Sequence, residues 1–260
     1  DGIAYLNFYL EEDADKESIL RDVRNALEEL RTFMDIGEGT IEESETEDKD
    51  WINNWKEFFH QFYVDDILIV PSWEEVKEED KDKMILHIDP GTAFGTGMHE
   101  TTQLVIRQLK KYVTRGAEIL DVGTGSGILG ITALKLGAGH VVGTDLDPCA
   151  VSAVQDNKEA NQIEDDSFDM MIGNIIDDVE VQNEVGYERY DIVAANILAD
   201  VLVPLTPVIV HQMKKGAYYI TSGILDVKEE VVREAVEKAG LTLVEVTKQG
   251  EWVCVTARKD

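Results

Sequence analysis

Two short segments carry the residue types of a site that binds a nucleoside. Residues 119–127 read Ile-Leu-Asp-Val-Gly-Thr-Gly-Ser-Gly, an apolar run that ends in an acid and continues with glycines at alternate positions. Residues 141–145 read Val-Val-Gly-Thr-Asp. A buried parallel strand produces each apolar run, and the glycines let the backbone turn tightly against a ligand. Asp145, at the end of the second strand, is placed to accept hydrogen bonds from ribose hydroxyls.

The glycine loop is compatible with two kinds of nucleoside cofactor. Residues from Gly125 to Gly130 fit the Gly-x-Gly-x-x-Gly pattern of dinucleotide-binding proteins. That interpretation leaves Gly123 inside the strand and gives no role to Asp121. Methyltransferases that use S-adenosylmethionine carry an acid just before the glycine loop, and residues 121–127 match their pattern at every position. The segment therefore favours a methyltransferase, with a dinucleotide-binding protein as the alternative.

A third segment, residues 190–199, places a polar residue at the end of another strand. It reads Tyr-Asp-Ile-Val-Ala-Ala-Asn-Ile-Leu-Ala. In a doubly wound sheet, ligands lie beyond the carboxyl ends of the strands, near the point where the strand order reverses. Many amino-group methyltransferases hold the substrate nitrogen with an Asn or Asp at this position, so Asn196 is the candidate catalytic residue. Asn196 is also a candidate cap for the helix that follows, and the two roles are compatible.

The spacing of apolar residues predicts the elements that position these segments. Helices are expected at 16–34, 101–112, 127–137, 147–160 and 226–239, and strands at 3–10, 66–70, 118–122, 140–145, 168–172, 190–195, 218–222, 241–247 and 252–258. Only residues 248–251 join the last two strands, and so short a connection requires an antiparallel hairpin. We predict an α/β fold: a seven-stranded Rossmann-like methyltransferase sheet with an antiparallel last strand, plus a small N-terminal α+β domain.

Longer motifs resemble one family. Residues 90–102 read Pro-Gly-Thr-Ala-Phe-Gly-Thr-Gly-Met-His-Glu-Thr-Thr, residues 50–59 read Asp-Trp-Ile-Asn-Asn-Trp-Lys-Glu-Phe-Phe, and residues 68–73 read Leu-Ile-Val-Pro-Ser-Trp. Together with Asn-Ile-Leu-Ala at 196–199, they resemble the methyltransferases that modify ribosomal protein L11. The resemblance runs from about residue 50 to the C-terminus, and Phe-Gly-Thr-Gly-x-His-x-Thr-Thr is its most specific part.

The resemblance implies which residues hold the cofactor. It assigns contacts with S-adenosylmethionine to a small set of positions: Thr102 or its neighbour Thr101, Gly123, Asp145 and Asn196. Further candidates lie in the glycine-rich segment and in the loops after the strands: Phe94, Gly95, Gly97, Asp121, Gly125 and Asn174. The family usually has an acid where this chain has Asn174, whose amide is the candidate for binding adenine. His99 is interpreted as orienting its neighbours rather than as a general base.

The motifs divide the chain into three predicted regions. Residues 1–70 form a small substrate-recognition domain, 71–100 a linker with the glycine-rich segment on the cofactor side, and 101–260 the S-adenosylmethionine-binding catalytic domain. The N-terminal domain of the family is longer than the stretch before residue 50, so the beginning of the chain is expected to be trimmed. The aromatic residues Trp51, Trp55, Phe58 and Phe59 are expected to pack between domains.

Composition limits the possible partners. Fifty-three acids against 24 bases give a formal net charge of −29. So acidic a surface repels nucleic-acid phosphates and attracts cationic proteins, and it also serves solubility. The five histidines show no metal-ligand spacing, and two cysteines cannot form a disulfide framework. No run of about 18 apolar residues occurs, so we expect a cytoplasmic enzyme without membrane span, metal or direct contact with nucleic acid.

The predicted function is methyl transfer from S-adenosylmethionine to amino groups of ribosomal protein L11, both lysine side chains and the N-terminus, before its assembly on RNA. One alternative is a methyltransferase with the same core that acts on another protein or a small amine. The other is an NAD-binding Rossmann protein, which the predicted hairpin disfavours because dinucleotide folds normally continue with parallel strands.

Overall fold

The computed structural model describes residues 15–31, 37, 39–41, 59–89 and 97–260. The chain divides into two compact units, residues 1–54 and 55–260, each considered by itself. Several predicted features lie outside the described residues: the strand at 3–10, the aromatic residues Trp51, Trp55 and Phe58, and the cofactor candidates Phe94 and Gly95.

The described part of the first unit is mainly one helix. Helix α1 spans Lys16–Arg31, which confirms the helix expected from residue 16 onward. The backbone N–H of Ser18 donates to the carboxylate of Asp15 at 3.1 Å, so Asp15 satisfies one of the free donors at the helix start.

A small sheet opens the described part of the second unit. Strands β1 (Phe62–Val64) and β2 (Ile67–Val70) form an antiparallel hairpin, and β3 (Met84–His87) pairs with β2 in parallel. The predicted strand at 66–70 is confirmed, whereas β1 and β3 are additions. The apolar side chains of the small sheet pack in the same hydrophobic cluster as the first helices that cover the large sheet. Residues 62–70, which were predicted to be part of the first domain, therefore belong to the second unit.

The large sheet confirms the predicted fold class. Its seven strands lie in the order β6-β5-β4-β7-β8-β10-β9, and β10 pairs antiparallel with both β8 and β9. The elements run in sequence as α3 (Glu100–Tyr112), β4 (Glu118–Val122), α4 (Ile128–Lys135), β5 (His140–Asp145), α5 (Cys149–Ala160), β6 (Phe168–Ile172), α6 (Val179–Val185), β7 (Tyr190–Asn196), α7 (Ala199–Ile209), β8 (Met213–Leu225), α8 (Glu229–Lys238), β9 (Leu241–Gln249) and β10 (Trp252–Lys259).

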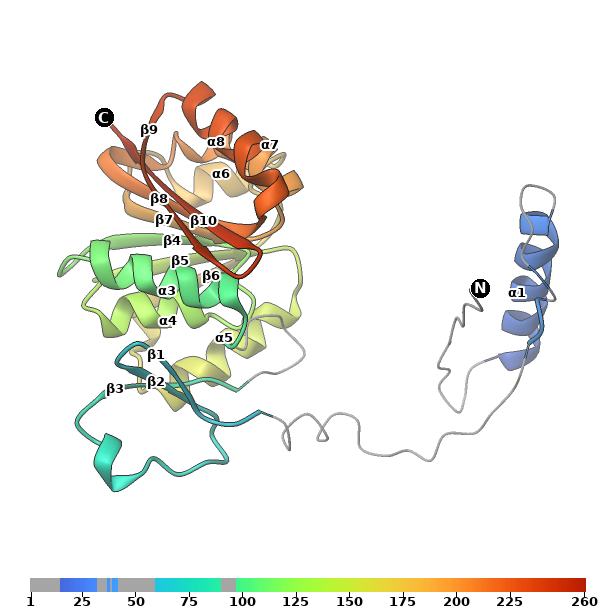
Figure 1. Cartoon of the computed structure of the whole chain (residues 1–260), viewed down its shortest axis with the longest axis horizontal. Coiled ribbons are helices and arrows are strands. Elements are labelled where there is room, and N and C mark those ends of the chain that lie inside the picture. Colours follow the sequence, from blue (N-terminus) through green and yellow to red (C-terminus); the bar gives the residue numbers. More distant parts are fainter. Residues whose placement is uncertain (1–14, 32–36, 38, 42–58, 90–96) are drawn as a thin grey trace. The chain divides into compact units, whose positions relative to one another are not determined.

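Helices cover both faces of this sheet. Side chains of α3, α4 and α5 pack with alternate strand residues in one hydrophobic cluster, and those of α6, α7 and α8 pack with the other residues of the same strands in a second cluster (Figure 1). In β4, for example, Ile119 belongs to the first cluster and Leu120 to the second. This period-two alternation is what two buried sheet faces require.

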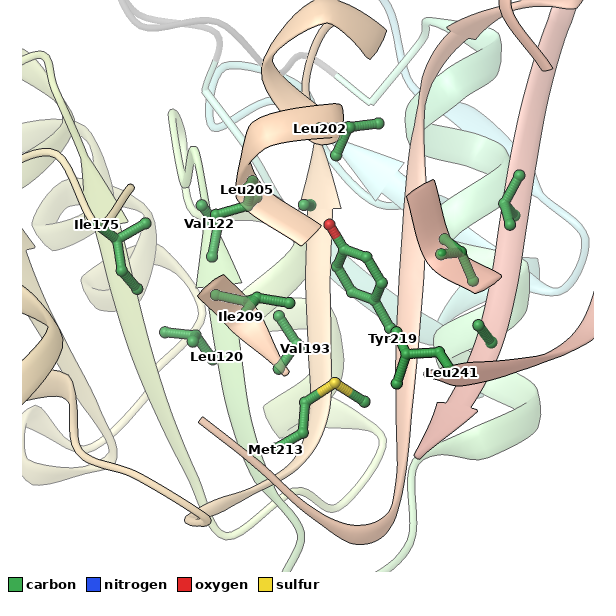
Figure 2. Close-up of a cluster of buried hydrophobic side chains, with 14 of the residues drawn as sticks. Leu120, Val122, Ile175, Val193, Leu202, Leu205, Ile209, Met213, Tyr219 and Leu241 are labelled. Carbon is green, nitrogen blue, oxygen red and sulfur yellow. The ribbon is translucent and has the colours of Figure 1, made fainter. Parts of the chain in front are cut away.

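The second cluster holds α7 against the middle of the sheet. Figure 2 shows Leu202, Leu205 and Ile209 of α7 beside Tyr219 of β8. The Tyr219 hydroxyl lies 3.4 Å from the Thr206 hydroxyl, so the buried phenol keeps a hydrogen-bond partner inside an apolar layer. Since only Ile197 and Leu198 lie between Asn196 and α7, this packing fixes the chain just beyond the end of β7.

Two differences from the predicted elements affect the ligand-binding edge. Strand β8 extends over residues 213–225 instead of 218–222, and it contains a β-bulge in which Ser222 and Gly223 lie opposite Cys254 of β10. Gly223 has a φ of +83°, which glycine adopts without strain. The bulge lies against the carboxyl end of β7, where Ser222 pairs with Asn196.

Candidate functional site

The candidate site lies at the carboxyl ends of the central strands. Strand β4 pairs with β5 on one side and with β7 on the other, so the strand order reverses at β4. Ligands of open α/β sheets bind at this switch point. The glycine loop after β4, the end of β5 and the end of β7 therefore meet at one place.

The loop after β4 turns on glycines with left-handed backbone. Gly123 and Gly125 have φ values of +73° and +54°. The Gly123 N–H donates to the Thr144 carbonyl of β5 at 2.8 Å, and the Gly125 N–H donates to the carboxylate of Asp145 at 2.8 Å. A Cβ atom on Gly123 would lie 2.5 Å from the Ile197 side chain, so the loop passes too close to the end of β7 for any larger residue.

Asp145 is held rigidly at the end of β5. One carboxylate oxygen accepts the Gly125 N–H, and the other accepts the N–H of Asp147 at 2.9 Å. Each oxygen of an ionised carboxylate has two acceptor sites, so each keeps one for a ligand. A ribose diol presents two donors, which matches this free capacity.

Asn196 carries an unsatisfied acceptor into the site. Its side-chain nitrogen donates to the Thr102 hydroxyl of α3 at 3.1 Å. Its side-chain oxygen is buried and has no hydrogen-bond partner among the described residues. A buried acceptor without a donor costs roughly 1–3 kcal/mol, and such exceptions call for an explanation. A ligand N–H would satisfy this oxygen.

The alternative role of Asn196 as a helix cap is wrong. Helix α7 has Leu198 as its N-cap, and no described side chain bonds to its first backbone N–H groups. The backbone N–H of Ile197 instead donates to the Ser222 carbonyl at 3.1 Å. The side-chain oxygen of Asn196 is therefore available to a ligand, while its nitrogen stays bonded to Thr102.

His99 and Thr101 form the wall opposite the glycine loop. The Thr101 N–H donates to Nδ1 of His99 at 3.3 Å, and the Thr101 hydroxyl lies 2.9 Å from the same nitrogen. The ring meets Trp252 of β10 edge to face, with 4.8 Å between centroids. Because Nδ1 accepts the backbone bond, a neutral His99 carries its proton on Nε2. This geometry supports the predicted orienting role over a general base.

These residues enclose one cavity of about 640 Å³, within the range of small-molecule sites. Six predicted residues line it: Thr101, Gly123, Gly125, Asp145, Asn174 and Asn196. Further lining residues, which were not predicted as ligand contacts, come from the loops and strand ends around them: Val122, Thr144, Leu146, Asp147, Ala150, Gly173, Ile175, Ile176, Ile197, Leu198, Val201, Leu205, Gly223 and Trp252, together with His99.

Three predicted contacts lie behind the wall rather than on it. Thr102 holds the Asn196 amide from the α3 side. Gly97 lies so close to the Ile128 and Ile69 side chains that a Cβ there would meet them at 2.6 and 3.0 Å. Asp121 is fully buried under the glycine loop, where one oxygen accepts the Gly130 N–H at 3.2 Å. These residues shape the site from outside.

The Asp121 carboxyl is in an unusual electrostatic position. Its second oxygen has no hydrogen-bond partner in the described part of the chain. Burial raises the pKa of Asp121 to about 7, the Gly130 N–H lowers it, and the nearby Asp145 carboxylate raises it further. The group thus carries its proton over much of the range in which an ordinary Asp is ionised.

Asn174 uses its side chain within its own turn. Its amide nitrogen donates to Asp177 at 3.0 Å, and its oxygen accepts the Ile176 N–H at 3.0 Å. These bonds hold the loop after β6, and Ile175 and Ile176 from this loop line the cavity beside Leu146. This side of the cavity offers apolar surface suited to a flat aromatic ring.

The residues fit an adenosyl amino acid as the bound group. Apolar side chains cover the end near β5 and β6, Asp145 supplies the acceptors for a ribose, and Gly123 and Gly125 line the cavity without side chains. Asn196, with its unsatisfied oxygen, stands at the other end, on β7. Within the ranges that the structure describes, no cluster of His, Cys, Asp and Glu suits a metal ion.

Known proteins share both the sequence and the fold. The family model described as "Ribosomal protein L11 methyltransferase (PrmA)" matches residues 3–260. The chain belongs to the ribosomal protein L11 methyltransferase family. The resemblance noted in the sequence is confirmed, and so is the prediction of a methyltransferase that uses S-adenosylmethionine.

Individual members of the ribosomal protein L11 methyltransferase family cover most of the chain. A ribosomal protein L11 methyltransferase from Lachnospira eligens is 57% identical over 260 residues, which is 100% of this chain and 82% of that protein. One from Agathobacter rectalis is 55% identical over 263 residues, with 100% and 81% covered.

Solved structures of methyltransferases have a similar fold. A ribosomal protein L11 methylase from Lactobacillus delbrueckii subsp. bulgaricus has 31% identity and a TM-score of 0.69, covering 78% of this chain and 100% of that chain. The precorrin-6y C5,15-methyltransferase from Geobacter metallireducens, at 15% identity and a TM-score of 0.53, covers 65% of this chain and 94% of its own and shares the fold alone.

Proposed function

We propose that the protein methylates amino groups of ribosomal protein L11, on lysine side chains and at the N-terminus, with S-adenosylmethionine as donor. The observation that carries this proposal is the buried, unsatisfied side-chain oxygen of Asn196 at the cavity end away from Asp145. An amine nitrogen presents an N–H to such an acceptor. Family membership supports the choice of substrate protein.

The protein residues contribute alignment to this reaction. When bound, S-adenosylmethionine would supply a methyl group activated by its sulfonium: the uncharged amine would form a bond to the methyl carbon as the carbon–sulfur bond breaks and the neutral thioether leaves. Asp145 and the glycine loop hold the nucleoside end, and Thr102 fixes the rotamer of Asn196 through their 3.1 Å bond. Holding two reactants in a near-attack geometry contributes roughly 7–11 kcal/mol.

The acceptor must lose its proton before it attacks. An α-amino group has a pKa near 8 and a lysine side chain one near 10.4, so the two acceptors differ in how much of each is uncharged at neutral pH. Nδ1 of His99 already accepts the Thr101 backbone N–H, so His99 supplies orientation rather than a free base. The apolar side chains of Leu198 and Val201 line the cavity and favour the uncharged form of an amine held against them.

The charge of the protein supports a basic substrate. The net charge of −29 attracts a lysine-rich protein and accelerates its encounter with the enzyme, while it opposes contact with RNA. We further propose that the first unit, residues 1–54 of the recognition domain predicted at 1–70, recognises the substrate protein, that methylation precedes ribosome assembly, and that the enzyme is cytoplasmic. Among the described residues, no helix is long and apolar enough to cross a membrane.

The test compares two asparagines at opposite ends of the cavity. Asn196→Ala should lower the turnover number for ribosomal protein L11 much more than it weakens S-adenosylmethionine binding, because its contact with the amine is formed mainly in the transition state. Asn174→Ala is the matched control and should mainly weaken cofactor binding. Calorimetry gives the cofactor affinity, and transfer of labelled methyl groups gives the rate.

The outcomes separate the proposal from its alternative. Equal losses of affinity and rate in Asn196→Ala would make this residue a cofactor ligand, with the amine held elsewhere. If the wild-type enzyme labels another protein or a small amine but leaves ribosomal protein L11 unlabelled, the same core serves a different substrate.

A further inference from the structure

A group of exposed apolar side chains borders the cavity on the side of Asn196. Leu198 is 67% exposed and Val201 39%, both at the start of α7, while Leu225 is 40% exposed at the end of β8 and Val227 82% exposed just after it. We call these four residues the apolar rim. Their exposure costs free energy in water, and contiguous apolar surface at a ligand site commonly marks an interaction surface.

Hydrogen bonds show that the two halves of the rim adjoin. Ile197 donates its backbone N–H to the Ser222 carbonyl, which joins the start of α7 to β8. Lys228 Nζ lies 3.0 Å from the carboxylate of Asp200, which joins the segment after β8 to the first turn of α7. The rim is therefore one surface built from two segments.

The rim is continuous with the cavity. Leu198 and Val201 line the cavity themselves. Leu225 pairs across the sheet with Trp252, which also lines it, and the Asp226 N–H donates to the Glu251 carbonyl beside this pair at 2.9 Å. A chain lying on the rim would thus lead directly into the site.

The strand order decides which reactant passes over the rim. Asp145 lies on β5 and Asn196 on β7, on opposite sides of β4, and β8 follows β7 on the side away from β5. With the nucleoside held at Asp145, the acceptor amine must reach Asn196 from the β7–β8 side. The rim occupies that side.

Acidic side chains edge the rim. Asp200, Asp226 and Glu251 are exposed, and Glu229 and Glu230 follow in the first turn of α8. Asp200 pairs with Lys228, Glu230 with Arg233, and Glu229 with both Arg233 and Lys248. Asp226 and Glu251 form no ion pair with a described residue, so these two carboxylates are available to a cationic partner. An apolar strip edged by carboxylates complements a segment in which apolar and cationic side chains alternate.

We propose that the apolar rim binds the segment of ribosomal protein L11 that carries the acceptor amine. An apolar neighbour of the methylated residue packs on Leu198, Val201, Leu225 and Val227, and cationic neighbours face Asp226 and Glu251. The inference rests on the proposed function and deepens it, because it assigns a specificity surface to the catalytic unit in addition to the recognition proposed for the first unit.

The test introduces a lysine on the apolar rim and, as a control, a lysine at an exposed position away from the cavity. Val227→Lys removes apolar surface and repels a cationic segment, and its side chain is 82% exposed, so the fold tolerates the change. Val244→Lys on β9, at a residue that is 43% exposed and does not line the cavity, is the control. Val227→Leu keeps the apolar surface.

Steady-state methylation of full-length ribosomal protein L11 by the full chain gives the readout. Val227→Lys should raise KM for the substrate protein tenfold or more and leave cofactor affinity unchanged, whereas Val244→Lys should match the wild type. Val227→Leu, which keeps an apolar contact with the substrate, should raise KM much less than Val227→Lys does. An unchanged KM in Val227→Lys would overturn the role of the rim. A wild-type enzyme that binds S-adenosylmethionine yet leaves ribosomal protein L11 unmethylated would instead overturn the proposed function.

Discussion

Gly223 in the β-bulge of β8 gives the sharpest prediction of stability. A Cβ atom at this position would lie 2.3 Å from the carbonyl oxygen of Ile197, 2.7 Å from its carbonyl carbon and 3.0 Å from its nitrogen. All three are backbone atoms, so no side-chain rotation relieves the contact. Gly223→Ala must therefore push the start of α7 away from β8.

Gly240, after the end of α8, separates this clash from backbone strain. It has a φ of +80°, close to the +83° of Gly223, but no described atom lies within 4 Å of its Cβ position. Left-handed backbone costs an alanine roughly 1–2 kcal/mol, so Gly240→Ala should lose about that much. Overpacking adds about 1–3 kcal/mol, so Gly223→Ala should lose about 2–5 kcal/mol.

Urea unfolding of the two variants, followed by far-UV circular dichroism, measures the difference in the free energy of unfolding. Gly223→Ala should also lower the methylation rate, because the displaced Ile197 follows Asn196 directly, while Gly240→Ala should keep the wild-type rate. Equal destabilisation by the two substitutions would show that β8 and the start of α7 separate at no cost and would refute the reasoning.

Three further predictions concern the cofactor, the buried acid and the first unit. Asp145→Ala removes acceptors for the ribose. Hydrogen bonds to charged groups contribute about 1.5–3 kcal/mol each, so calorimetry should show at least a tenfold loss of S-adenosylmethionine affinity. An unchanged affinity would disprove the assignment of Asp145 to the ribose. The pKa of Asp121 is about 7 in the folded protein against 3.8 for an ordinary Asp, so the unfolded chain binds fewer protons and wild-type stability falls as pH rises through this range. The free energy of unfolding of Asp121→Asn should therefore increase relative to that of the wild type as the pH rises from about 4 to 7, by up to about 4 kcal/mol at 1.36 kcal/mol per pKa unit. Urea unfolding at several pH values measures this difference, and a difference that does not depend on pH would contradict the prediction. A chain without residues 1–54 should keep its affinity for the cofactor, because every residue that lines the cavity lies in the second unit. It should no longer methylate ribosomal protein L11. If it transfers labelled methyl groups as fast as the full-length chain does, the first unit does not recognise the substrate.

The central strands could be predicted because a buried strand is the one element that accounts for their residue pattern. Strands β4, β5 and β7 are short apolar runs buried on both faces; β5 and β7 end in a polar residue, and a glycine follows β4 directly. The antiparallel hairpin at the end followed from the length of its turn. Strands β1 and β3 were not predicted, because runs of three or four residues between acidic turns show too little periodicity to be recognised.

The site was only partly predictable for a related reason. Asp145, Asn196 and the glycines are chemically distinctive, so their types and spacing indicate a role. Leu146 and Leu198 are ordinary apolar residues in loops, and only the fold brings them to the cavity. The position of Trp252 could have been predicted from the expected hairpin. Strand β10 runs antiparallel to β8, so its first residue lies beside the carboxyl end of β8, at the ligand-binding edge of the sheet.

The position of β10 has a consequence for the order in which the sheet can form. Strand β10 lies between β8 and β9, although β9 comes before it in the sequence. Until β10 is in place, β9 lacks its partner strand and β8 exposes an open edge. Insertion of β10 closes this gap and brings Trp252 against His99, so the same step completes the sheet and one wall of the cavity.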